Sequence, residues 1–180
     1  MKLRLFYLLV ILLTTLTSCS KENESCESPV DCLPPATQTG ANTVGCLVDG
    51  KVLVPAGKGF GTGAVLKAQY STYEGDILFG IVVRDVDSGR NLYLELRSER
   101  IEEKKNYELN VVSDTTNYAI YSQGSLGFFQ TNEIYKGEIY FSKVDFSKRI
   151  ASGTFWFDAK DDENGEVVEV REGRFDVVFF

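Results

Sequence analysis

Hydrophobic and polar residues alternate along most of the chain after residue 44. Leu92, Leu94 and Leu96 are separated by polar or amphipathic residues, and Val168 and Val170 alternate with charged ones. Successive side chains of a β-strand point to opposite faces, so this period of two predicts strands with one buried and one wet face. The strands predicted in this way span residues 45–48, 51–54, 64–73, 77–84, 91–97, 107–112, 118–122, 135–144, 150–158, 167–171 and 174–180.

Short turn sequences separate these segments. Asp49-Gly50 is a dipeptide that favours a two-residue hairpin loop, in which both turn residues need a positive φ. Asn164-Gly165 predicts a further hairpin near the end of the chain. Residues 98–105 are the one helical candidate, but they lack an apolar stripe and would make at most a turn or two. The pattern predicts an all-β domain over residues 44–180, an antiparallel β-sandwich or open barrel of about ten strands.

Residues 1–18 have the layout of a secretory signal peptide. Lys2 and Arg4 precede an apolar run over residues 5–13, which is about half of the roughly 20 residues that a membrane-spanning helix needs. The Leu-Thr-Ser-Cys sequence that ends at Cys19 resembles the lipobox of bacterial lipoproteins. The resemblance implies cleavage before Cys19 and attachment of several acyl chains to it, which together anchor a protein firmly.

Residues 19–43 contain almost no large apolar side chains and are rich in Ser, Glu, Thr, Pro and Asn. Such a segment cannot bury enough surface to offset the entropy of ordering it, which predicts a flexible tether. Its first residues, 20–24, are polar and acidic, much like the export signal that Bacteroidota lipoproteins use to reach the outer face of the outer membrane. We therefore expect a lipid-anchored outer-membrane protein, at the cell surface or on the periplasmic face.

Composition narrows the classes of function. The chain has no histidine, the residue most often used for acid–base catalysis near neutral pH and a common metal ligand. Loss of Lys2 and Arg4 with the signal peptide takes the formal charge from −7 to −9, which disfavours nucleic acid as a partner. We expect no enzyme, no cofactor and no metal site, and we assign no catalytic residue.

Lipidation of Cys19 would leave three cysteines. Cys46 could pair with Cys32, or Cys26 with Cys32, with Cys46 then buried and free in its apolar segment. The three cysteines lack the closely spaced pairs typical of zinc sites. A disulfide here would pin the tether and would not build a scaffold.

Two groups of side chains are candidates for a functional surface. A pair of carboxylates can hydrolyse glycosides, and the acidic residues that gather near one hairpin tip are Asp158, Asp161, Asp162, Glu163 and Glu166. A solubilising turn or a weak calcium site are the other interpretations of this cluster. Aromatic side chains can stack on sugars or peptides, and the tyrosines expected on strand faces are Tyr70, Tyr73, Tyr93, Tyr118, Tyr121, Tyr135 and Tyr140.

One short motif suggests a covalent modification. Asp114-Thr115-Thr116 resembles the acceptor of O-glycosylation in exported Bacteroidota proteins. The resemblance marks Thr115 as the modified residue.

Two longer segments carry a family resemblance. Residues 33–51, from Leu-Pro-Pro-Ala-Thr to Gly-Cys-Leu-Val-Asp-Gly-Lys, and the closing residues 150–157 and 166–176 are similar to a family of small Bacteroidota lipoproteins known only as a domain of unknown function. Members usually carry an aromatic residue where Leu53 stands. The resemblance implies the envelope address and the approximate fold, and it supplies no catalytic residue.

The expected function is therefore that of an envelope-anchored lipoprotein that binds or organises other molecules. A glycan, a peptide or a neighbouring envelope protein is the expected partner, besides the membrane reached through the lipid, and the oligomeric state stays open. The alternatives are a carboxylate-based polysaccharide hydrolase and a small-molecule carrier with a barrel interior, as in lipocalin-like proteins.

Overall fold

One antiparallel sheet of eleven strands makes up most of the chain that the structure, a computed structural model, describes. The described residues are 26–58, 63–73, 76–97, 100–124 and 127–180, so the expected signal peptide 1–18 and Cys19 lie outside them. The elements are η1 (Pro29–Cys32), β1 (Thr43–Val48), β2 (Lys51–Leu53), β3 (Leu66–Tyr73), β4 (Asp76–Asp85), β5 (Arg90–Arg97), β6 (Lys105–Leu109), β7 (Tyr118–Gln123), β8 (Phe128–Gln130), β9 (Gly137–Asp145), β10 (Ile150–Asp161) and β11 (Val167–Val178).

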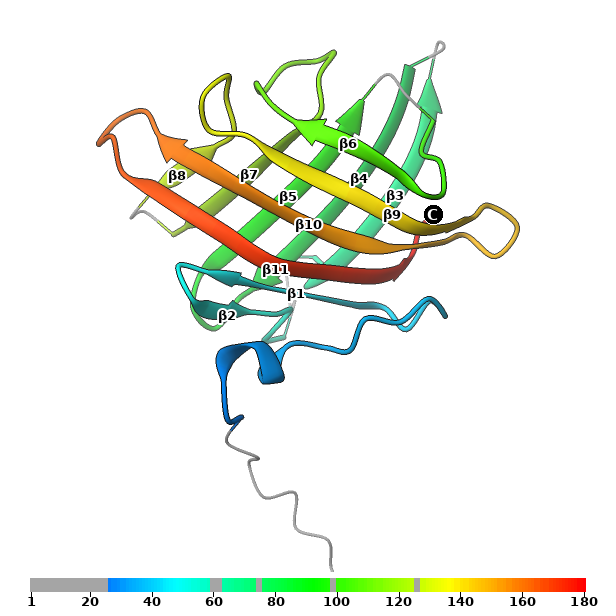
Figure 1. Cartoon of the computed structure of the whole chain (residues 1–180), viewed down its shortest axis with the longest axis horizontal. Helices are drawn as coiled ribbons and strands as arrows, with labels where there is room; N and C mark the ends of the chain where they lie inside the picture. The colour runs from blue at the N-terminus through cyan, green and yellow to red at the C-terminus, as the bar shows by residue number, and fades with distance from the viewer. Residues whose placement is uncertain (1–25, 59–62, 74–75, 98–99, 125–126) are drawn as a thin grey trace, which may run out of the picture.

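The sheet runs in the order β2-β1-β11-β10-β8-β7-β5-β4-β3 and branches at β10. Residues 150–157 of β10 pair with β9, which also pairs with β6, whereas residues 160–161 pair with β8. Figure 1 shows β6, β9, β10 and β11 in front of β3, β4, β5 and β7, crossing them steeply. The sheet thus curls over on itself as a half-barrel, and the predicted all-β antiparallel fold is confirmed.

Backbone hydrogen bonds tie the two outer edges of the sheet to the rest. The Tyr70 N–H on β3 donates to the Phe180 carbonyl at 2.9 Å, joining that edge to the end of the chain. Beyond β2, Ala56 forms a parallel bridge with Asp85 at the end of β4. Exposed strand edges are sites for unwanted pairing, and these contacts occupy part of the β3 edge and the chain just beyond β2.

The core lies between the two crossing layers and is centred on Phe141. The ring of Phe141 on β9 lies 5.3 Å from that of Phe79 on β4, 5.5 Å from Phe175 and 5.6 Å from Tyr107. All four side chains are buried. Edge-to-face contacts between aromatic rings stabilise by roughly 0.5–1.5 kcal/mol each beyond their buried area, so one β9 residue joins strands from both layers.

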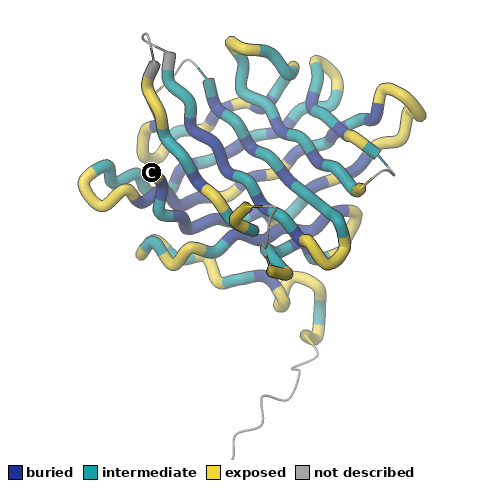
Figure 2. Tube along the Cα trace, turned by 180° about the vertical axis from the view of Figure 1, so that it is seen from behind, coloured by how far each residue is buried: buried dark blue, intermediate teal, exposed yellow. Residues whose placement is uncertain are grey.

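Local sequence signals explain most of these elements. Leu92, Leu94 and Leu96 are buried on one face of β5, as their alternation predicts. Asp49 and Gly50 both have positive φ, +48° and +75°, so the predicted tight hairpin joins β1 to β2. Figure 2 shows the resulting pattern, in which buried segments follow the strands and exposed segments gather at the turns.

Three segments differ from the sequence prediction. The pattern misses β8, three residues long. The two segments predicted from residue 167 onward are one strand, β11, whose pairing with β10 contains a bulge. No helix forms among the described residues of 98–105, because Ile101 is buried in the core and the Tyr107 hydroxyl binds the backbone at Glu102 and Arg100. In the described part of the chain no helix has the length and apolarity of a membrane span.

A buried carboxylate fixes the last part of the segment whose composition predicts a flexible tether. Asp176 on β11 is 1% exposed. Its oxygens accept hydrogen bonds from Thr39 N at 2.9 Å, Gly40 N at 2.8 Å, Ala41 N at 3.0 Å and Ser152 Oγ at 2.7 Å, and also from the hydroxyls of Thr37 and Thr39. Residues 37–41 are therefore held on the β domain.

The hydrogen bonds decide the ionisation of Asp176. Burial alone would raise the pKa of this carboxyl, but donors from Thr37, Ala41 and Ser152 outweigh burial and hold the pKa well below its usual range. A carboxyl whose pKa is lowered by folding stabilises the fold above its unfolded pKa, about 3.9, and loses that contribution as the pH falls toward the folded value.

Replacing this carboxylate should therefore cost stability in a pH-dependent way. We expect Asp176→Asn to lower the free energy of unfolding by about 3 kcal/mol at pH 7, because an amide NH₂ would face hydrogen-bond donors. Urea unfolding followed by circular dichroism should show the difference from the native chain narrowing below about pH 4. Asp87→Asn, at an exposed position of the β4–β5 turn, is the control with little effect. A difference that is the same at pH 7 and pH 2 would contradict this account.

Candidate functional site

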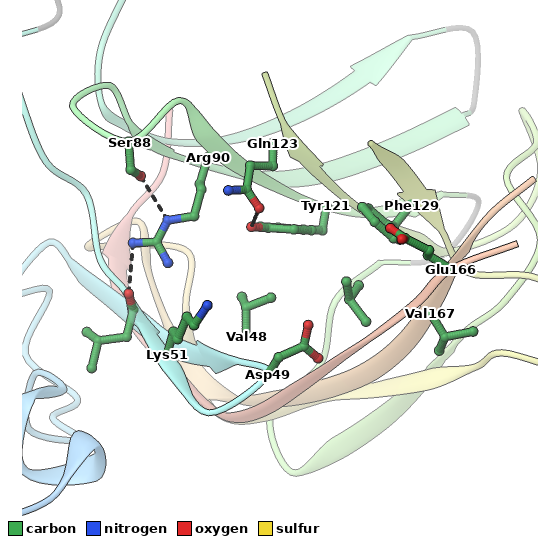
Figure 3. A pocket seen from close by; sticks show the side chains of 12 residues that line it. Val48, Asp49, Lys51, Ser88, Arg90, Tyr121, Gln123, Phe129, Glu166 and Val167 are labelled. Carbon is green, nitrogen blue, oxygen red and sulfur yellow. Dashed lines mark hydrogen bonds between the residues drawn. The ribbon is translucent and has the colours of Figure 1, made fainter. Parts of the chain in front are cut away.

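A pocket of about 670 Å³ opens at one end of the half-barrel, and we call it the mouth pocket. Its walls come from the β1–β2 hairpin, the start of β5, the strands β7 and β8, and the beginning of β11 (Figure 3). The lining residues are Val48, Asp49, Lys51, Val52, Ser88, Arg90, Tyr121, Gln123, Phe129, Glu166, Val167 and Val168. Its volume lies within the range of roughly 300–1,000 Å³ that is usual for small-molecule sites.

Arg90 is held rigidly at one end of the mouth pocket. Its Nε donates to Ser88 Oγ at 2.8 Å, and its Nη2 donates to the Val52 carbonyl at 2.9 Å and to Asp85 Oδ2 at 2.8 Å. Ser88 also donates its hydroxyl and its N–H to Asp85. Burial would raise the pKa of Asp85, but these donors lower it, so the pair stays ionised. Arg90 thereby links β2 to the β4–β5 turn.

The charges in the mouth pocket are separated. Figure 3 shows the second terminal nitrogen of Arg90 and the ammonium group of Lys51 at one end, Glu166 at the other, and Asp49 between them. Lys51 and Glu166 are exposed and have no ion-pair partner among the described residues. The pocket therefore presents two cations at one end and the Glu166 carboxylate at the other, with the Asp49 carboxylate between them.

An apolar wall lies between these charges. The rings of Tyr121 and Phe129 are 5.8 Å apart and both are buried, with Val168 beside them in the lining. The Tyr121 hydroxyl donates to Gln123 Oε1 at 3.3 Å. Burial raises the pKa of Tyr121, so the phenol stays neutral and remains a donor.

The cysteines take one of the two arrangements that the sequence leaves open. Cys26 and Cys32 form a disulfide, and Cys46 on β1 is a buried free thiol. Burial raises the pKa of Cys46 to about 12, although the charge of Arg90 acts in the opposite direction. A thiol this protonated and covered is chemically inert in the folded protein.

The acidic residues near the β10–β11 hairpin do not converge. Asp158 pairs with Arg171 at 2.7 Å. Asp161 is buried and accepts the N–H groups of Phe128 at 3.1 Å and Glu163 at 2.8 Å, so it fastens β8 to the hairpin. Glu166 alone of the five lines the mouth pocket. Among the described residues no three Cys, Asp or Glu side chains are placed to share a metal ion.

The tyrosines do not all lie on one surface, and Tyr93 lines a separate hollow on β3, β4 and β5. Tyr121 faces the mouth pocket, Tyr70 packs against Phe146 at 5.1 Å, and Tyr140 lies on the outer side of β9. The candidate for O-glycosylation, Thr115, is exposed in the segment between β6 and β7.

A known protein family matches most of the β domain. Residues 58–178 match the model of a family described as a domain of unknown function (DUF6252). The chain belongs to this family. The DUF6252 match covers every strand from β3 to β11 and contains the closing segments 150–157 and 166–176, whereas the opening segment 33–51 lies before it. No curated protein and no solved structure gives a significant match.

Sequence reasoning missed Arg90 and Lys51, although one signal points to the arginine. Arg90 is two residues before Leu92 and four before Leu94, so it lies on the same face of β5 as these buried residues. A charged side chain on the inward face at the start of a strand needs a local partner, and Asp85 supplies it. Lys51 has no comparable signal, because a lysine beside a hairpin turn is ordinary.

Reactivity of the Cys46 thiol should report the integrity of this end of the half-barrel. We expect Cys46 to react with iodoacetamide at pH 8 only when β1 and β2 open, and Arg90→Met to accelerate the reaction by about tenfold because it removes the bond to Val52. Mass spectrometry of the labelled peptide measures the rate. Arg149→Met, at an exposed turn position, is the matched control. Equal labelling rates in the native chain and in Arg90→Met would show that Arg90 does not hold the hairpin.

Proposed function

We propose that this protein is a lipoprotein of the bacterial envelope, anchored in the outer membrane through Cys19, whose β domain binds a small ligand in the mouth pocket. The observation that carries the binding role is the pocket itself, in which a fixed guanidinium, an apolar wall and unpaired charges surround about 670 Å³. Ligand sites characteristically combine an apolar lining with a few well-placed polar groups.

The proposed address rests on the amino-terminal sequence. The apolar run 5–13, the lipobox-like residues before Cys19 and the acidic residues that follow it support export and lipidation. The family resemblance of residues 33–51 and 150–157 supports a Bacteroidota origin. Exposed Thr115 is the proposed site of O-glycosylation.

Lipidation is testable in a bacterial host of the Bacteroidota. We expect the native chain to incorporate radiolabelled palmitate and to fractionate with the outer membrane, and Cys19→Ser to do neither, because the thioether needs the sulfur. Ser18→Ala, a small-residue change beside the cleavage site, is the control that keeps both properties. Lipid-free native protein would contradict the proposed anchor and leave the pocket proposal intact.

The mouth pocket has positive charge at one end and negative charge at the other, which favours a zwitterionic ligand. We propose that this ligand is a short peptide. Its carboxylate would lie between Lys51 and Arg90, its ammonium group near Glu166, and a side chain against Phe129. Charge-assisted hydrogen bonds to a fixed arginine are strong and directional. The aromatic wall offers area for an apolar side chain.

A hydrolase is not the function that this geometry favours. Glycoside hydrolysis needs two carboxyl groups on either side of the scissile bond, whereas Asp158 and Asp161 are each occupied by their own partners. The interior of the half-barrel is filled by buried side chains such as Phe79 and Phe141, whose rings are in contact. The ligand we propose therefore lies at the mouth and not inside the barrel.

Isothermal titration of the purified full chain with the dipeptide Leu-Phe tests this proposal. We expect binding that weakens by about tenfold when the dipeptide is acetylated and amidated at its ends, and by a similar factor in Lys51→Ala, since each change removes a charge-assisted contact. Lys148→Ala, at an exposed position of the β9–β10 turn, is the control that leaves affinity unchanged. Equal affinity for the capped and free dipeptides would contradict a site that recognises both charged ends of a peptide.

A further inference from the structure

A second hollow of about 360 Å³ lies on the outer face of β9, β10 and β11, and we call it the outer groove. Figure 1 shows these three strands side by side at the front of the molecule. Side chains that line the groove include Glu138, Tyr140, Thr154, Trp156, Arg171 and Arg174. The strand register forms rows across the face: Thr154 lies opposite both Tyr140 and Arg174, and Trp156 lies opposite Glu138.

Trp156 is the one tryptophan of the chain, and 44% of its surface is exposed. Its neighbours Phe155 and Phe157 are buried, so the alternation of β10 directs the indole outward. An exposed indole on a sheet face offers a rigid apolar surface with an N–H at its edge, which is why tryptophan is enriched at interfaces.

The backbone beside Trp156 is irregular in a way that shapes the groove. Phe155 pairs with Gly173 and Phe157 with Val170, so β11 has two residues, Arg171 and Glu172, where β10 has one. Glu172 has a φ of +55°, a conformation that residues other than glycine rarely adopt. Bulges redirect side chains and are frequent beside functional sites.

Arg171 is directed by this bulge onto the indole. Its guanidinium lies 5.6 Å from the centre of the Trp156 ring, and it donates to the Phe157 carbonyl at 3.1 Å and to Asp158 Oδ1 at 2.7 Å. The arginine is therefore held in place by the strand itself. It buttresses the indole while 44% of the Trp156 surface stays open.

We propose that the outer groove binds a neutral sugar ring of a polysaccharide. The apolar face of the ring would stack on Trp156, and its hydroxyls would bond to Glu138, Tyr140 and Arg174, which together offer acceptors and donors. The formal charges of the lining arginines are matched by those of Glu138 and Glu172, which favours an uncharged ligand. A volume near the lower limit for small-molecule sites suits one or two rings better than a protein surface.

Because the chain has one tryptophan, its fluorescence reports on this groove specifically. The full chain is titrated with two soluble neutral polysaccharides, a β-glucan and a mannan, while Trp156 emission and acrylamide quenching are followed. We expect at least one of them to shift the emission to shorter wavelength, to protect the indole from quenching, and to retard the protein in a gel containing that polysaccharide. The dipeptide Leu-Phe, which addresses the mouth pocket, should leave Trp156 emission unchanged.

Two variants distinguish specific binding in the outer groove from nonspecific binding to exposed aromatic side chains. Trp156→Ala should weaken retardation by about tenfold or more, as loss of a central aromatic contact does, without changing the thermal midpoint much because the indole is half exposed. Phe128→Ala removes another exposed aromatic, 54% exposed and outside the groove, and should bind like the native chain. Retardation that survives in Trp156→Ala, or the absence of any spectral change with both polysaccharides, would overturn the proposal. Capture of a protein by the native chain but not by Trp156→Ala, with neither polysaccharide binding, would overturn it in favour of a protein partner.

Discussion

The rest of the structure depends on the antiparallel pairing of β10 with β11. The two strands pair from Ile150–Val178 to Lys160–Val167 around one bulge. The mouth pocket is lined by the start of β11, the outer groove is centred on the bulge, and the Asp176 anchor lies near the end of β11. One hairpin thus sets the positions of both proposed sites and of the segment that enters the domain.

Close backbone contact allows β10 to pair with β9 along one part of its length and with β8 along another. A Cβ on Gly153 would lie 1.8 Å from the Tyr140 carbonyl oxygen, and one on Gly137 would lie 2.3 Å from that of Trp156. Only glycine fits at these positions, so β9 can press against the first part of β10 while β8 takes the other end. The pattern of buried residues does not reveal this branching, because a strand shared between two partners has the same alternation as any other.

The sequence predicts features that depend on neighbouring residues, such as strands and turns. It does not predict contacts between residues that are far apart along the chain. Alternation in β5 and the Asp49-Gly50 turn are encoded within a few residues, so they can be predicted. Asp176 binds backbone groups 135 and 136 residues away in sequence, and composition around residues 37–41 gives no sign of that carboxylate. The mouth pocket is assembled from four segments that are distant along the chain, so its residues could not be grouped without the fold.

The anchor at Asp176 also bears on how the domain would sit at a membrane. With acyl chains on Cys19, as we propose, the seven-residue step to Cys26 can span at most roughly 25 Å, and η1 follows directly and lies beside β2 in Figure 1. Since residues 37–41 are fixed on β11, the η1 end of the domain would face the bilayer at short range, with β6 at the far side. A connection of this maximum length restricts how far an anchored domain can move from the bilayer, so it would limit the directions from which ligands reach its sites.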